Sequence, residues 1–161
     1  MQEKVRMFYA IGLLIVGSLL SGCWVFRNWI DYLPLTSVGL TPDSKTYVGY
    51  FVPRHSGRHM LSLRIRRHGD DGNVAVGLRI HGIVRTYWHG HAKEYPIEVI
   101  LDQVTLPPGM FDVRLGEFPA EKATDPSQDY GSFHLEAEGD LSEFLSGQPE
   151  SMFSVSFDET E

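Results

Sequence analysis

Apolar and polar residues alternate along most of the chain after residue 45, and this period of two predicts β-strands. The alternation is clearest in 59–68 and 73–81, where Leu, Ile and Val occupy every second position over most of each stretch. Strand 83–89 either continues 73–81 or restarts after Gly82, and a change of phase within 97–106 indicates a β-bulge. The remaining expected strands span 46–52, 110–118, 132–138 and 152–157.

Turn-forming residues separate these strands. Gly69-Asp70-Asp71-Gly72 predicts a hairpin between the two clearest strands, and Pro107-Pro108-Gly109 predicts a second turn. Residues 119–131 are polar and are expected to form a loop, while 140–147 begins with the N-cap residue Asp140 and ends with a glycine, as a short helix does. Seven or eight short strands, each with one apolar face, predict an all-β, antiparallel β-sandwich of jelly-roll or immunoglobulin-like type.

The N-terminal region has a different pattern. Lys4 and Arg6 precede the apolar run 8–23, which is the arrangement of a secretory signal and predicts an apolar helix. The run closes with Leu20-Ser21-Gly22-Cys23, which resembles the lipobox of bacterial lipoproteins. The resemblance covers the first 23 residues and implies loss of residues 1–22, acylation of Cys23 and stable lipid anchoring of the mature chain.

An uncleaved membrane anchor that extends to about residue 30 is the alternative, because 8–26 holds 19 residues without formal charge. Aromatic residues follow Cys23 in place of a polar tether, and they suit an interfacial belt. Both interpretations make 23–45 an anchor and connector and 46–161 the sandwich domain. Both also place this domain in the bacterial cell envelope, facing the periplasm or the exterior.

Cysteine content and charge restrict the chemistry of the domain. Cys23 is the only cysteine, so the mature domain has no internal disulfide and no cysteine-based metal site. The chain carries −7 overall, but seven arginines and two aspartates give 54–91 a charge of +5, whereas twelve acids and one lysine give 117–161 a charge of −11. An acidic whole argues against nucleic-acid binding.

Four cationic residues are candidates for ligand binding. If the 69–72 turn pairs its two strands as a hairpin, Arg64, Arg66, Arg79 and His81 share one face. Such a face is either neutralised by the acidic C-terminal strands of the same molecule or binds an acidic partner, such as a protein or anionic lipid headgroups.

The string Tyr87-Trp88-His89-Gly90-His91 is the most unusual local feature. In an extended segment His89 and His91 project to the same side, and with His81 they make a weak candidate for a metal site. Solvated histidines at a strand end are the simpler explanation. The aromatic residues Tyr87 and Trp88, with Tyr95, suit a platform for a sugar ring or a protein partner, or else belong to the core.

The sequence contains none of the nucleophile-elbow, phosphate-loop, dinucleotide-binding or zinc-protease motifs. We therefore expect a non-catalytic domain that binds a protein or a glycan and has no cofactor. In size, address and expected fold the chain resembles small β-sandwich envelope lipoproteins, among them periplasmic immunity proteins that neutralise secreted toxins. That function, and a role as an accessory subunit of an envelope assembly, are the alternatives.

Overall fold

The computed structural model describes residues 34–67, 73–105, 109–147 and 150–158. Cys23 and the expected signal or anchor helix lie outside these ranges, as do the residues of the predicted 69–72 turn. Within the described ranges, no helix is long and apolar enough to cross a membrane.

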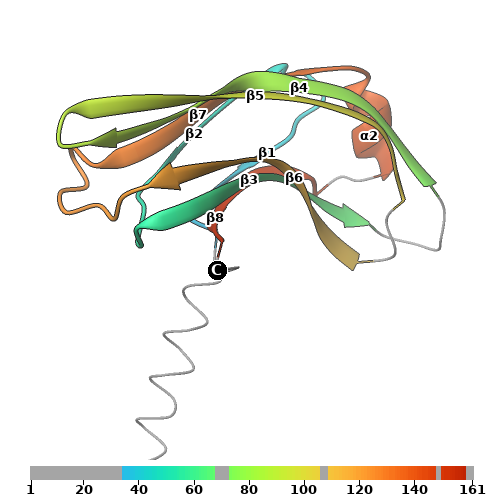
Figure 1. Cartoon of the computed structure of the whole chain (residues 1–161). Helices are drawn as coiled ribbons and strands as arrows, with labels where there is room; N and C mark the ends of the chain where they lie inside the picture. Colours follow the sequence, from blue (N-terminus) through green and yellow to red (C-terminus); the bar gives the residue numbers. More distant parts are fainter. Residues whose placement is uncertain (1–33, 68–72, 106–108, 148–149, 159–161) are drawn as a thin grey trace, which may run out of the picture. The chain divides into compact units, whose positions relative to one another are not determined.

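The described chain is an all-β sandwich of two antiparallel four-stranded sheets, as the alternation predicts, and its two layers are seen edge-on in Figure 1. One sheet has the strand order β1-β8-β3-β6 and the other has the order β2-β7-β4-β5. The elements are β1 (Thr36–Gly39), β2 (Thr46–Phe51), β3 (Gly57–Arg67), β4 (Asn73–Trp88), β5 (His91–Thr105), β6 (Gly109–Ala120), β7 (Tyr130–Glu138), α2 (Leu141–Gly147) and β8 (Met152–Phe157).

The strand pairing is nested. β4 pairs with β5, β3 with β6, β2 with β7 and β1 with β8, as if one long hairpin had been rolled up from its tip. This order is that of a jelly roll and differs from the order of an immunoglobulin domain. The strand β1 lies within the stretch expected to be a connector, and it pairs with β8, the last of the described strands.

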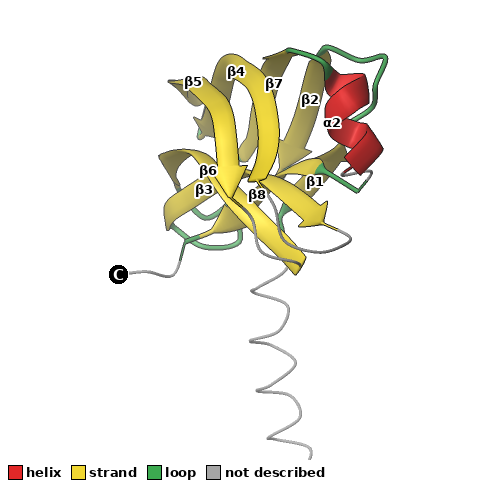
Figure 2. Cartoon of the chain, turned by 90° about the vertical axis from the view of Figure 1, so that its right-hand side faces the viewer, coloured by secondary structure: helices red, strands yellow, loops and turns green. Residues whose placement is uncertain are grey.

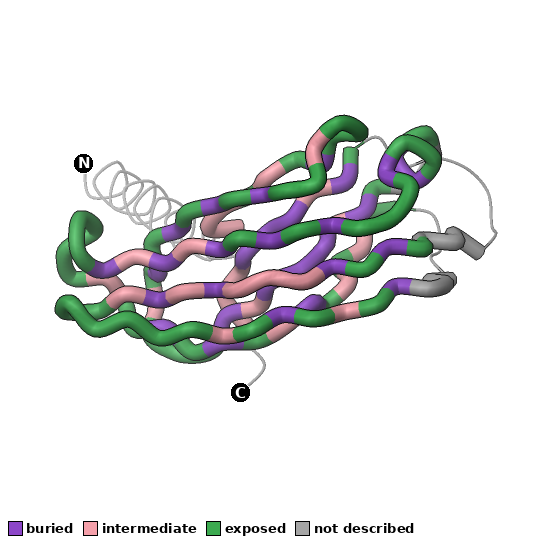
Figure 3. Tube along the Cα trace, turned by 90° about the horizontal axis from the view of Figure 1, so that it is seen from above, coloured by how far each residue is buried: buried purple, intermediate pink, exposed green. Residues whose placement is uncertain are grey.

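The core lies between the two sheets and follows the predicted alternation, which Figure 3 shows along the strands. Leu61, Leu63 and Ile65 of β3 are fully buried, and so are Phe153 and Val155 of β8. Apolar residues of α2 add to this core at the end of the sandwich opposite the β4–β5 hairpin (Figures 1 and 2). The helix begins as predicted, because the backbone N–H of Glu143 donates to Asp140 Oδ1 over 2.9 Å.

The prediction that β3 and β4 form a hairpin is wrong, because the two strands belong to different sheets. β3 pairs with β6 and β8, whereas β4 pairs with β5 and β7. Residues 68–72 therefore join the two sheets rather than two paired strands. A Gly-Asp-Asp-Gly sequence favours a turn of the chain, but it does not determine which strand the next segment pairs with.

Two register shifts adjust the alternation. β4 continues through Gly82 without a break. The β-bulge expected within 97–106 lies on the partner strand β4 instead, where Val76 and Gly77 stand opposite one residue of β5. A second bulge leaves Leu115 of β6 without a direct partner on β3. This bulge lets both Leu115 and Phe118 point into the core although they are three residues apart.

Candidate ligand-binding site

The tip of the β4–β5 hairpin forms one end of the sandwich, at the left of Figure 1. His89 and Gly90 connect the strands with positive φ angles of 47° and 79°, as a two-residue type I′ turn requires. The chain turns at His89 instead of staying extended, so the condition under which His89 and His91 were expected to project to the same side does not hold.

A pocket opens beside this turn, between the hairpin and the end of β6, and we call it the hairpin-end pocket. Its cavity volume is about 80 Å³, and it is open to solvent. Its lining combines aromatic rings with a cation, an imidazole, a hydroxyl and a carboxylate. The lining residues are Pro53, Thr86, Tyr87, Trp88, His91, Lys93, Tyr95, Pro119, Ala120 and Glu121.

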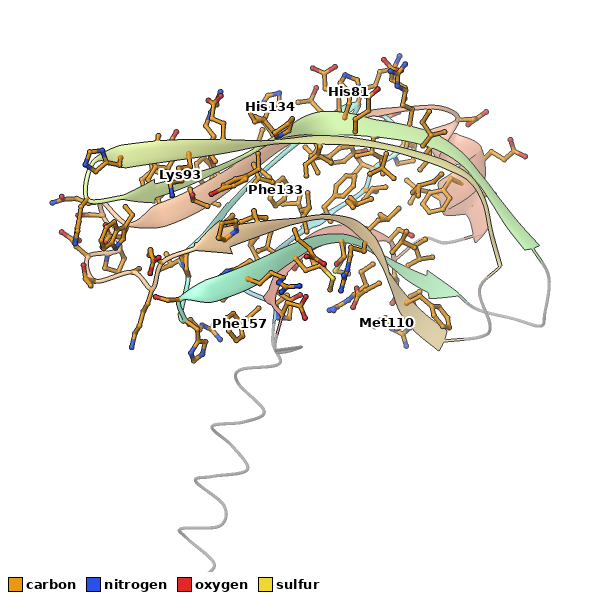
Figure 4. The ribbon with its side chains drawn as sticks, viewed as in Figure 1. His81, Lys93, Met110, Phe133, His134 and Phe157 are labelled. Carbon is orange, nitrogen blue, oxygen red and sulfur yellow. The ribbon has the colours of Figure 1, made fainter. Side chains whose placement is uncertain are left out.

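The strand register explains why these side chains converge. Trp88 stands opposite His91, and Lys93 stands opposite the buried Thr86, so they share the face of their sheet that looks toward the other sheet. Figure 4 shows Lys93 on this inner side, near the hairpin. At this end of the sheet the face is lined by Trp88, His91 and Lys93, and the end of β6 lies across the pocket from them.

Aromatic core residues support the pocket from within. The ring of Tyr95 lies 6.0 Å from that of Phe118, centroid to centroid, and Phe118 lies 5.6 Å from Phe51. Phe118 and Phe51 are almost completely buried. The inner wall of the pocket is therefore continuous with the hydrophobic core.

The buried carboxylate of Asp129 fastens the loop 121–129, here called the end loop, to the hairpin. Its Oδ1 accepts the backbone N–H of His89 over 2.9 Å. Its Oδ2 accepts the backbone N–H groups of Thr124 and Asp125 and the Thr124 hydroxyl. These hydrogen bonds hold the pKa of the Asp129 carboxyl well below its ordinary value, and the hydrogen bond from the His89 backbone has the largest effect. No sequence motif singles out Asp129, whose partners come from two separate segments.

Two of the predicted aromatic residues meet at this site. Trp88 lines the pocket with 42% of its surface exposed, and Tyr95 lines it as well. Tyr87 also borders the pocket, but its ring stacks on that of Tyr130, with centroids 4.5 Å apart and planes 21° apart. The predicted platform is thus divided between the pocket and the outer face of the sheet.

The three histidines of the candidate metal site lie apart. His91 lines the hairpin-end pocket, His89 is in the turn with Nδ1 3.5 Å from Asp129, and His81 is on the outer face of its sheet (Figure 4). In the described part of the chain, no three His, Cys, Asp or Glu side chains are placed to share a metal ion.

The predicted common face for Arg64, Arg66, Arg79 and His81 is wrong, because β3 and β4 lie in different sheets. Each of the four has an acidic neighbour in the same molecule, at 2.5–3.5 Å. Hydrogen bonding to Asp112 raises the pKa of the Arg64 guanidinium, and Glu98 does the same for Arg79. The acids come from β5, β6, β7 and Glu150, so only part of the neutralising charge belongs to the acidic C-terminal region.

Comparisons of the chain with protein-family models, with curated proteins and with solved structures found no match. A jelly roll by itself carries many unrelated functions. The functional argument therefore rests on the hairpin-end pocket.

Proposed function

We propose that this chain is a membrane-anchored lipoprotein of the bacterial envelope, and that its β-sandwich is a non-catalytic module that binds a glycan at the hairpin-end pocket. The observation that carries the proposal is the meeting of Trp88 and Tyr95 with Lys93, His91 and Glu121 in one open pocket. Ligand sites typically combine apolar and aromatic surface with a few converging polar groups.

The two kinds of side chain match the two kinds of surface on a sugar. A pyranose ring presents C–H groups on its faces and hydroxyls around its edge. The indole of Trp88 packs against His89 at 4.3 Å and remains 42% exposed, so part of its surface is available for stacking. Lys93 and His91 supply hydrogen-bond donors, and Glu121 supplies an acceptor.

The pocket is also held in shape before any ligand arrives. Asp129 ties the end loop to the hairpin, and Tyr95 rests on the buried Phe118. A preformed site loses less conformational entropy on binding, which favours affinity for a polar and strongly hydrated ligand.

The proposed anchor is the lipid on Cys23, since Leu20-Ser21-Gly22-Cys23 resembles a lipobox. Cys23→Ala tests it. The wild-type protein is expected to incorporate labelled palmitate and to lose residues 1–22, and the variant is expected to incorporate none and to keep those residues. If the variant is processed at the same site and partitions like the wild type, the protein is not lipidated on Cys23.

The glycan proposal is tested with the full-length protein purified in detergent. Peptidoglycan fragments and lipopolysaccharide-derived oligosaccharides are titrated by calorimetry against the wild type, Trp88→Ala and Met110→Ala. We expect saturable binding by the wild type and a loss of about fivefold or more in affinity for Trp88→Ala, because stacking contributes on the order of 1 kcal/mol. Met110, which is 55% exposed on the other sheet, serves as the matched control and should bind like the wild type.

Two results oppose the proposal. Equal affinities for the wild type and Trp88→Ala would place the ligand elsewhere. Absence of binding to every glycan, together with tight binding to a toxin encoded beside this chain, would favour the immunity-protein alternative.

A further inference from the structure

An apolar stripe lies on the outer face of the edge strand β2 and continues directly after it. Val48 is 43% exposed, Tyr50 is 67% exposed and Val52 is 41% exposed, and we call these three residues the β2 stripe. The residues between them alternate in the opposite direction, and Tyr47 and Phe51 are buried in the core. Edge strands commonly carry charged side chains at exposed positions, but the β2 stripe carries none.

The β2 stripe runs into a hollow beside the C-terminal end of β2, and we call it the β2-edge hollow. Its lining is apolar and aromatic apart from one arginine, and it includes two residues of the stripe. The lining residues are Leu35, Tyr50, Phe51, Val52, Arg54, Pro126 and Tyr130. Contiguous exposed apolar surface of this kind marks a contact with a partner or with a membrane.

The side chains that stand opposite the β2 stripe on β7 carry no carboxylate. His134 stands opposite Val48, and Ser132 stands opposite Tyr50. Glu136 lies on the same face beyond His134, at the end away from the hollow. Because an anionic bilayer repels carboxylates, the uncharged part of this acidic chain is the part that can approach such a surface closely.

One acidic residue adjoins the hollow. Asp125 precedes Pro126, and its carboxylate accepts the backbone N–H of Ser127 over 3.0 Å and the Ser127 hydroxyl over 2.7 Å. The lining itself contains a cation, Arg54, and no carboxylate. The hollow therefore presents no acidic group to a negatively charged surface.

The first described residues show where the N-terminal region joins the domain. Leu35 lines the β2-edge hollow, and its backbone N–H donates to the carbonyl oxygen of Val155 over 2.7 Å. Cys23 precedes Leu35 by 12 residues, and a chain of that length spans at most about 43 Å. For an anchor that extends to about residue 30, the limit is roughly 18 Å. Either anchor therefore keeps the hollow close to the bilayer.

We propose that the β2 stripe and the β2-edge hollow form a docking surface for the bilayer to which the chain is anchored. The inference goes beyond the proposed function and rests only on its membrane-anchoring part. Tyrosine suits the boundary between headgroups and acyl chains, because its ring is apolar and its hydroxyl is polar. A short tether raises the effective concentration of the surface at the bilayer to about the millimolar range, so a few apolar side chains suffice.

A protein is the other class of partner for exposed apolar surface. The position of Leu35 favours the bilayer, because an anchor that enters the domain beside the hollow keeps this surface within reach of lipid at all times. A protein partner would have to reach the same surface in competition with the bilayer.

The test places a fluorescent label on the stripe. Full-length protein is reconstituted in vesicles of phosphatidylethanolamine and phosphatidylglycerol, part of which carries a doxyl quencher just below the headgroup. An environment-sensitive label is attached to the Val52→Cys variant. The matched control is Ile100→Cys, since Ile100 is 63% exposed on the other edge strand of the same sheet. The unsubstituted chain measures any label that Cys23 takes up, and this signal is subtracted.

The label at Val52→Cys is expected to lose roughly half or more of its emission to the quencher, because interfacial side chains lie within about 10 Å of the headgroup boundary. The label at Ile100→Cys should keep its emission. Adding Tyr50→Glu to Val52→Cys should restore the emission, because a carboxylate opposes insertion among the lipids, whereas Tyr50→Phe should leave the quenching in place.

Flotation of the same vesicles separates this proposal from the proposed anchor. Protein that floats with the vesicles but shows equal emission at the two labelled positions would leave the anchor standing and overturn the docking surface. Protein that does not float would overturn both. Quenching that persists in Tyr50→Glu would also oppose the docking surface. If the label at Val52→Cys stays unquenched and Tyr50→Glu releases a protein that co-purifies with the wild type, the stripe is a protein interface instead.

Discussion

At the scale of single residues, His59 is a titratable residue placed in the hydrophobic core. It lies on β3, completely buried, with its ring against Phe118 and Phe157. The Nδ1–H group donates to the Gly57 carbonyl oxygen over 3.1 Å, and Nε2 has no hydrogen-bond partner among the described residues. Burial therefore lowers the pKa of His59 below its ordinary value of 6.5.

This burial predicts a loss of stability in mild acid. The folded state keeps His59 neutral while the unfolded state takes up a proton, so the free energy of unfolding falls as pH drops below about 6.5, by up to about 1.4 kcal/mol per pH unit. Urea denaturation between pH 7.5 and pH 5 measures the slope. His59→Met should flatten it, and the exposed control His134→Gln should keep it. Identical slopes for wild type and His59→Met would contradict the assignment.

Asp129 predicts an effect at neutral pH. In the wild type, both carboxylate oxygens of Asp129 accept hydrogen bonds from backbone N–H groups, whereas Asp129→Asn keeps only one acceptor oxygen. The end loop should therefore loosen, and the denaturation midpoint of the domain should fall at pH 7. Because the carboxyl has a lowered pKa in the folded protein, its contribution is present above about pH 4 and is lost as pH falls further. The gap between variant and wild type should therefore narrow in acid. Asp125→Asn, exposed in the same loop, is the control and should have the smaller effect.

At the scale of elements, β4 depends on one glycine. Gly82 sits in the middle of the strand with φ at +155°, and a Cβ atom there would meet the carbonyl oxygen of His134 at 2.1 Å. The added Cβ atom would be attached to the backbone of β4, and the carbonyl oxygen belongs to the backbone of β7. The two atoms therefore cannot separate without disturbing the β4–β7 pairing. The glycine therefore allows the strand to pass close to its neighbour without a break.

Gly82→Ala is expected to destabilise the domain by at least about 2 kcal/mol, through the clash and the unfavourable φ. Gly39→Ala on the edge strand β1 is the matched control, because nothing lies within 4 Å of its added Cβ. It should change stability by less than about 0.5 kcal/mol. Chemical denaturation of both variants measures the difference, and equal effects would refute the argument from close approach.

At the scale of the whole molecule, the nested roll makes the last strand essential to the first. β8 lies between β1 and β3, and its Phe153 and Val155 are fully buried. Loss of one buried phenylalanine commonly costs about 3–5 kcal/mol, which is comparable with the whole stability of many domains. The fold is therefore complete only when both ends of the described chain are in place.

Deletion of residues 152–161 is accordingly expected to abolish the cooperative unfolding transition and the near-ultraviolet circular dichroism of the domain. Deletion of 159–161 alone, which leaves β8 intact, is the control and should preserve both. A cooperative transition in the longer deletion would show that the domain folds without its eighth strand.

The amino-acid sequence by itself determined the fold class, most strand positions and the buried face of each strand. These features depend on short-range patterns, because alternation follows from the opposite orientation of successive side chains. The helix over 140–147 was predictable for the same reason, since its Asp140 cap acts three residues away. Trp88, which lines the hairpin-end pocket, was a candidate from the sequence because it belongs to an unusual local string.

Only the tertiary structure decided which strands are partners, and with that the site. Leu63 alternates in the same way whether β3 pairs with β4 or with β6, so the pattern cannot reveal that Arg64 and Arg79 belong to different sheets. The contacts of Asp129 with His89 and the stacking of Tyr87 on Tyr130 join residues about 40 positions apart. Such contacts arise from pairing over long separations, which local propensity does not encode. They hold together the end of the sandwich at which the pocket opens.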